Sequence, residues 1–178
     1  MEKRSQYTIQ FASLTAGEHQ YEYHVSDAFF VPYEHSLIHK ADVNVNVILE
    51  KGVNNLQFTF TFTGRIHMTC VRCLDEFDMA VEEEDRHLMV RQLDALDAPV
   101  EEEEDIIGIP MTAHEIDLAP HIYDYLNLMV PLNPMHSDKE DGSLGCNQKT
   151  LDEMKNYLGH DPINDDPRWA LLKKLKLK

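Results

Sequence analysis

The chain has 178 residues, of which 43% are hydrophobic and 27% are charged. This balance excludes a disordered chain and a membrane-embedded one, and the length suits one globular unit or a main domain with a smaller appendage. The formal net charge of −16 disfavours long-range attraction to nucleic acid or to membrane surfaces.

Cysteine usage and the first residues indicate the compartment. Two of the three cysteines lie in one Cys-x-x-Cys pair, and the chain opens on the polar segment Met1-Glu2-Lys3-Arg4-Ser5-Gln6. An odd number of cysteines does not suit a disulfide framework, and the first residues lack the apolar core of a secretory signal. No apolar run approaches the roughly 20 residues that a membrane-spanning helix needs. We therefore expect a cytoplasmic protein in a reducing environment.

Alternating polarity predicts strands in the first half of the chain. The alternation is clearest from Leu56 to Cys70, and Gly64 within it predicts a bend or a break. The Lys51-Gly52 turn predicts a hairpin between residues 42–50 and 56–63. Shorter alternating stretches lie at residues 7–11, 21–25, 43–49, 77–81 and 87–91. No helical pattern intervenes, which predicts an antiparallel sheet in a barrel-like or sandwich form.

Helical spacing of apolar residues begins after an acidic stretch. Residues 116–130 place apolar side chains on one helical face, with Asp117 as the cap and Pro131 as the stop. A second helix is predicted over residues 150–158, with a capping box at its start. A third begins at Asp166-Pro167 and carries an apolar side and a lysine-rich side.

These elements predict an α+β fold in which about three helices follow the sheet. We expect an antiparallel β domain over residues 1–92, an acidic linker over 93–105, and a helical part over 106–178 that packs on the sheet. Residues 75–105 carry a net charge of −12, whereas residues 168–178 carry +5. Both segments suit solvated faces; alternatively, the first would face a basic protein, and the second an RNA backbone or another acidic surface.

Cys70-Val71-Arg72-Cys73 is the sharpest local motif. It falls where one predicted strand ends and the next begins, which is the place for a zinc-knuckle turn. A structural zinc takes four protein ligands, and the chain offers Cys146 as a third thiolate. His136 is the preferred fourth ligand, because it lies in the same 134–146 loop as Cys146. The alternative is that the thiols are reduced and metal-free; a thioredoxin role would need a βαβ context, which is missing.

Motifs for catalysis are absent from the sequence. There is no phosphate-binding loop, no dinucleotide fingerprint and no nucleophile elbow, and no spacing selects one pair among the histidines and carboxylates. Phe58, Phe60 and Phe62 alternate with threonine and lack flanking basic residues, which favours core packing over stacking on RNA bases. We therefore expect a protein that is not an enzyme.

Several segments taken together resemble the YceD family, the large ribosomal RNA subunit accumulation proteins. They are the acidic stretch and, in chain order, Gly64 ahead of Cys70-Val71-Arg72-Cys73-Leu74, Glu115-Ile116-Asp117-Leu118, Val130-Pro131-Leu132, and Asp166-Pro167-Arg168-Trp169 with Leu172 and Leu175. The resemblance implies a bacterial-type factor for the accumulation or processing of 23S ribosomal RNA. Many relatives carry further cysteine pairs after the apolar helix. The ligand set of this chain would therefore contain fewer cysteines than theirs, namely Cys70, Cys73 and Cys146 with His136.

These observations lead us to expect a ribosome biogenesis factor that contacts precursor large-subunit RNA, a basic ribosomal protein, or both. The acidic charge makes the basic protein the easier partner. Trp169 either anchors the last helix on the sheet or docks a partner. The alternatives are a metal-dependent RNA-processing enzyme and an acidic chaperone-like module for a basic ribosomal protein. The candidate partner-binding residues are Arg65, Arg72, Arg168, Trp169, Lys173, Lys174 and Lys176.

Overall fold

The structure is a computed structural model that describes residues 5–33, 35–38, 40–93, 106–137 and 145–157. The chain divides into two compact units. The sheet unit comprises Met1–Thr69 and Glu76–Pro134, and the cysteine unit comprises Cys70–Asp75 and Met135–Lys178. In the part of the chain that is described, no helix is long and apolar enough to cross a membrane.

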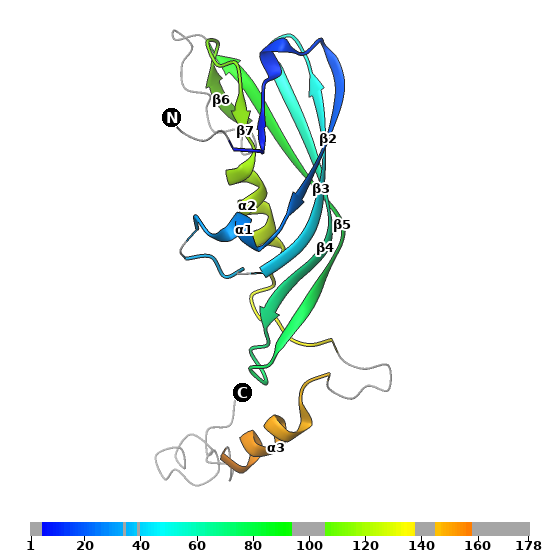
Figure 1. Ribbon diagram of the computed structural model, residues 1–178, viewed down its shortest axis with the longest axis vertical. Helices are drawn as coiled ribbons and strands as arrows, with labels where there is room; N and C mark the ends of the chain where they lie inside the picture. The colour runs from blue at the N-terminus through cyan, green and yellow to red at the C-terminus, as the bar shows by residue number, and fades with distance from the viewer. Residues whose placement is uncertain (1–4, 34, 39, 94–105, 138–144, 158–178) are drawn as a thin grey trace, which may run out of the picture. The chain divides into compact units, whose positions relative to one another are not determined.

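The sheet unit is built on a five-stranded sheet with the strand order β2-β3-β4-β5-β6 (Figure 1). The first four strands are antiparallel neighbours, and β6 runs parallel to β5. A second, two-stranded sheet pairs β1 with β7. The bounds are Thr8–Ile9 for β1, Gly17–Val25 for β2, Lys40–Lys51 for β3, Asn55–Thr69 for β4, Glu76–Leu93 for β5, Ile106–Pro110 for β6 and Ile116–Asp117 for β7.

The predicted α+β class and the β3–β4 hairpin are confirmed, with two corrections to the sheet. The sheet is open rather than barrel-like, since β2 and β6 end the five-strand order. It is also not wholly antiparallel, because β6 joins β5 in parallel. A parallel neighbour needs a crossover connection of about a dozen residues. Residues 94–105, between β5 and β6, supply that length and lie outside the described residues.

The inner face of the sheet and α2 (Ala119–Met129) enclose the hydrophobic core of the sheet unit. Phe58, Phe60 and Phe62 of β4 are fully buried, and the rings of Phe60 and Phe62 contact Tyr125 of α2. Full burial stabilises a phenylalanine side chain by about 1.5–3 kcal/mol. The predicted core role of these rings is confirmed, and it removes them from contact with RNA bases.

The alternation in residues 77–91 predicted one or two strands, and the structure contains one, β5, with a bulge opposite Gly64. Phe62 lies opposite Glu84, but Gly64 lies opposite Val81. β5 therefore advances three residues over a stretch in which β4 advances two. This extra residue moves the inward positions of β5 from even numbers, such as Leu88, to odd numbers, such as Val81. One continuous strand therefore carries two alternation patterns.

The helices agree with prediction in place but not in their first residues. The helix predicted from residue 116 begins at Ala119, because Asp117 pairs in β7. The Asp117 carboxylate still accepts a hydrogen bond from the Ala119 N–H at 3.0 Å. α3 (Gln148–Tyr157) begins two residues before the predicted cap, and Asn147 accepts the bond from Lys149 N–H. A short helix, α1 (Asp27–Phe30), was not predicted, and the third predicted helix lies outside the described residues.

His67 on the outer face of the sheet is expected to make stability depend on pH. Its imidazole bonds Asp78 at 2.8 Å and Glu76 at 3.0 Å, and these bonds raise the pKa of His67 above 6.5. The stabilisation is therefore fully present below about pH 6.5 and is lost as the pH rises through the raised folded-state pKa. The effect is small because both carboxylates are more than half exposed.

We expect an NMR titration to give His67 a pKa above 6.5 and Asp78→Asn to lower it. His67→Gln should flatten the pH dependence of unfolding in this range. His87→Gln is the matched control, because His87 lies on the same face but bonds Thr59. An equal effect of the two histidine substitutions would contradict the prediction.

Candidate metal centre

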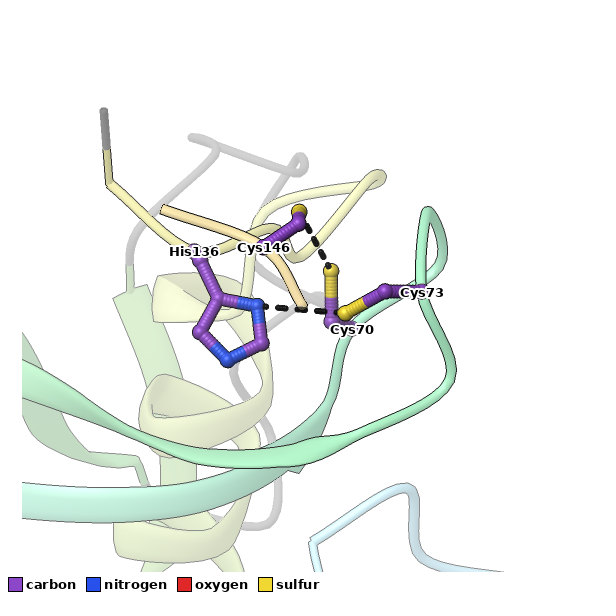
Figure 2. A group of neighbouring side chains, drawn as sticks. All are labelled: Cys70, Cys73, His136 and Cys146. Carbon is purple, nitrogen blue, oxygen red and sulfur yellow. Dashed lines mark hydrogen bonds between the residues drawn. The ribbon is translucent and has the colours of Figure 1, made fainter. Parts of the chain in front are cut away.

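Four side chains of the cysteine unit converge on one point. Cys70 and Cys73 come from the turn that follows β4, whereas His136 and Cys146 come from the segment after α2. Their ligand atoms all lie within 4.8 Å of one another. Dashed lines in Figure 2 mark two hydrogen-bonded pairs: Cys70 Sγ with Cys146 Sγ at 3.8 Å, and Cys73 Sγ with His136 Nδ1 at 3.5 Å. The residues predicted as metal ligands therefore lie together and could bind a metal ion.

The turn places its two thiols by local backbone bonds. Leu74 N–H donates to Cys70 C=O at 2.8 Å, and Cys70 N–H donates to Asp75 C=O at 2.9 Å. Leu74 has a φ of 60°, in the left-handed region that costs a branched residue conformational energy. Its side chain is 73% exposed, so core packing does not repay that cost. Leu74 directly follows Cys73. Its left-handed backbone conformation lets its N–H bond back to Cys70 C=O, which closes the Cys-x-x-Cys turn.

The donor geometry fits a tetrahedral zinc. Zn–S bonds of about 2.3 Å and Zn–N bonds of about 2.0 Å at tetrahedral angles require S···S separations of about 3.8 Å and S···N separations of about 3.5 Å. The Cys70 Sγ to Cys146 Sγ separation is 3.8 Å, and the Cys73 Sγ to His136 Nδ1 separation is 3.5 Å. All three sulfurs are buried, and His136 is half-buried. Three thiols and one imidazole, screened from water, are the donor set of a structural zinc site.

The surroundings shift the pKa values of two of the thiols, Cys70 and Cys146, in opposite directions. Burial by itself raises the pKa of Cys70, but hydrogen bonds from the backbone of Cys73, His136 and Arg72 outweigh it and lower that pKa to about 6. Burial and the neighbouring thiols Cys70 and Cys73 raise the pKa of Cys146 to about 11. At neutral pH, Cys70 is therefore the thiolate that a cation meets first, and Cys146 must release its proton for a metal to bind.

Arg72 lies against the cluster, which the sequence did not indicate. Its guanidinium donates to Cys146 Sγ at 3.8 Å and contacts Met135 Sδ at 3.3 Å. A positive group beside a thiolate favours the ionised sulfur. The place of Arg72 inside the Cys-x-x-Cys turn is the signal that could have indicated this contact. Its role in partner binding stays a prediction.

Of the other predicted partner residues, only Arg65 is among the described residues. Arg65 is exposed on β4, in the register position opposite Asp42. The positions of the remaining five are not described: Arg168, Trp169, Lys173, Lys174 and Lys176.

Comparison with known proteins identifies the family. A family model described as large ribosomal RNA subunit accumulation protein YceD matches residues 58–176. This range contains all four residues of the cysteine–histidine cluster together with α2 and α3. No curated protein and no solved structure matches the chain. Because the family model covers well over half of the 178 residues, the chain belongs to the YceD family.

Proposed function

We propose that this protein is a non-enzymatic ribosome biogenesis factor that supports the accumulation of 23S ribosomal RNA and the assembly of the large subunit. The family match over residues 58–176 carries this proposal, because the family is described by large ribosomal RNA subunit accumulation. The match begins inside β4 and runs past α3, so it spans the Cys-x-x-Cys turn and the segment that supplies the other two donors.

We propose further that Cys70, Cys73, His136 and Cys146 hold one structural zinc. When bound, the ion would fasten the 70–75 turn to the segment containing His136 and Cys146. Three thiolates and a neutral imidazole around Zn²⁺ leave one negative charge. The guanidinium of Arg72, 3.8 Å from Cys146 Sγ, offsets that charge at the sulfur it contacts.

The donor set also favours a binding role over a catalytic one. A catalytic zinc keeps one position open for water or substrate, whereas four protein donors close the site. Within the described residues, no other group of three or more His, Cys, Asp or Glu side chains is close enough to share an ion. The alternative of a metal-dependent RNA-processing enzyme needs such a group, so the described residues offer it no support.

The charge distribution favours a basic protein as one partner. The whole chain carries −16, and the outer face of the sheet exposes carboxylates from β2, β3 and β5. They include Glu18, Glu22, Asp42, Glu50, Glu76, Asp78 and Asp85. This face would repel an RNA backbone. Direct RNA contact is therefore proposed for the basic end of the chain, at Arg168, Lys173, Lys174 and Lys176.

A deletion strain tests the function. Cells that lack the protein should show a lower ratio of 23S to 16S ribosomal RNA and fewer large subunits on a sucrose gradient. Expression of the wild type should restore both. A deletion strain with normal 23S levels and normal subunit profiles would overturn the proposed function.

Neutralising the basic end is expected to weaken association with precursor large-subunit particles. Replacing Arg168, Lys173, Lys174 and Lys176 by Gln should reduce co-sedimentation and flatten its salt dependence. Each lost phosphate contact lowers the slope of log K against log salt by roughly 0.7–0.9. The control replaces four exposed basic residues elsewhere by Gln, namely Lys40, Arg91, Lys149 and Lys155. Equal co-sedimentation of the two variants would rule out the basic end as the RNA contact.

A further inference from the structure

A pocket in the sheet unit, far along the chain from the cysteines, has the walls of a cation-binding site. It has a volume of about 430 Å³ and lies where the segment before β1, the region around α1 and the start of α2 meet. Its lining includes Tyr7, Ser26, Phe29, Tyr33, Asp117 and Ala119. We call it the Tyr33 pocket. None of its described lining residues is a lysine or an arginine, so among the described residues the pocket brings together aromatic rings and a carboxylate without a cation.

The aromatic walls are fixed by contacts with one another. The Tyr33 ring stacks on Tyr123 with centroids 3.8 Å apart and an interplanar angle of 5°. Phe29 lies 5.8 Å from Tyr33 and meets Tyr7 edge-on at 5.1 Å. The Tyr7 hydroxyl donates to His24 C=O at 3.3 Å, which fixes the orientation of its ring. Rings that are already ordered can receive a ligand with little further loss of conformational entropy.

Asp117 supplies the negative charge of the pocket. One of its oxygens accepts the hydrogen bond from Ala119 N–H at 3.0 Å, which holds the carboxylate at the start of α2. Burial, followed by Asp117 and Asp124, raises the pKa of Tyr33, and burial together with Tyr21 and Asp117 raises the pKa of Tyr23 to about 12. Burial is the larger cause of both shifts, and the smaller part that Asp117 contributes reflects its negative charge close to these hydroxyls, which favours a cation over an anion in the pocket.

We propose that the Tyr33 pocket binds the guanidinium of an arginine side chain presented by a basic protein partner. A guanidinium is planar, stacks on aromatic faces and pairs with a carboxylate, so one group satisfies the ring walls and Asp117 together. The charge of −16 over the whole chain would draw a basic partner toward this site. The proposal goes beyond the proposed function, because it identifies a site and the chemistry of its ligand.

The experiment titrates the full-length protein with the peptide acetyl-Gly-Arg-Gly-amide and follows backbone resonances by NMR. The comparison peptide replaces arginine by citrulline, which keeps the shape and removes the charge. We expect saturable shifts at Tyr33, Asp117 and Ala119 with a Kd on the order of a millimolar for arginine, and at least about tenfold weaker binding for citrulline.

Two substitutions test the walls separately. Asp117→Asn keeps an oxygen for the Ala119 N–H and should weaken arginine binding about tenfold, whereas Tyr33→Leu removes the ring face and should weaken it several-fold. Glu22→Gln, on the outer face of the sheet, is the control with the same change in net charge, and it should leave binding within about twofold. Equal binding of citrulline, or equal effects of Asp117→Asn and Glu22→Gln, would overturn the proposal. The binding assay contains only the protein and a short peptide, with no ribosomal component. Support for or failure of this proposal is therefore independent of the proposed function.

Discussion

Removing the proposed zinc is expected to unfold the cysteine unit while the sheet unit stays folded. The two units differ in what can stabilise them. The hydrophobic core cluster formed by the described residues lies in the sheet unit. Among the described residues of the cysteine unit, the buried hydrophobic side chains are Cys70, Cys73, Cys146 and Leu151. The described residues of this unit bury little apolar surface and its three cysteines are free, so we expect the described part to depend on a metal, as small domains with little core do.

The size of the effect follows from the coupling of metal binding to folding. Structural zinc binds small zinc domains with an apparent free energy of about 10–16 kcal/mol at neutral pH, and that energy is folding energy when the apo form is unfolded. Such a loss is comparable to or larger than the total stability of a typical domain, about 5–15 kcal/mol. We therefore expect Cys73→Ser or a strong chelator to abolish protection from hydrogen exchange in α3, with protection in β3 and β4 retained.

Two measurements make this prediction decisive. Elemental analysis of the purified wild type should give about one zinc per chain, and Cys73→Ser should give close to none. Val71→Ser is the matched control, because it places serine in the same turn at a half-exposed position that offers no ligand. It should keep both the zinc and the protection of α3. A metal-free wild type with α3 fully protected would show that the cysteines are reduced thiols beside a turn.

The predictions that came from local patterns agree best with the structure. Alternating polarity correctly predicted β2, β3 and β4, and the Lys51-Gly52 turn correctly predicted the β3–β4 hairpin. Both signals depend on residues that are close in sequence. The same dependence explains the misses. α1 has only four residues, which is too short for a helical period, and β1 pairs with β7 across more than a hundred residues. The parallel direction of β6 has no local signature at all.

The four residues of the proposed metal site were predictable in identity but not in arrangement. Cys70 and Cys73 share one turn, and Cys146 is the third and last cysteine, so the thiols followed from the sequence alone. His136 was chosen among ten histidines because it shares a loop with Cys146, and the structure places it 3.5 Å from Cys73, 63 positions away. That separation depends on the path of the chain after α2. Arg72 against Cys146 and the aromatic walls around Asp117 were likewise set by long-range packing.

Gly64→Ala is expected to be one of the most destabilising single substitutions in the sheet unit. Gly64 has a φ of 151°, which side-chain-bearing residues rarely adopt, and it sits at the register shift between β4 and β5. A Cβ there would lie 2.2 Å from Asp42 C=O and 2.7 Å from Val43 Cα, both backbone atoms of β3. Backbone strain of this kind costs about 1–3 kcal/mol, and forced overlap in a packed interior adds about 1–3 kcal/mol more.

Gly17→Ala separates the two costs. Gly17 also has a positive φ, 123°, but a Cβ at that position meets nothing within 4 Å. It should therefore lose only the conformational part, about 1–3 kcal/mol in the free energy of unfolding measured with urea. The excess for Gly64→Ala then measures how closely β3 approaches β4 at the bulge. Buried residues of β5 lie on both sides of this bulge, Leu88 on one side of the register shift and Val81 on the other. If the strands separated to admit the methyl group, part of the core would therefore be exposed. Equal losses for the two alanine variants would mean that the close approach of the strands at Gly64 contributes nothing to stability.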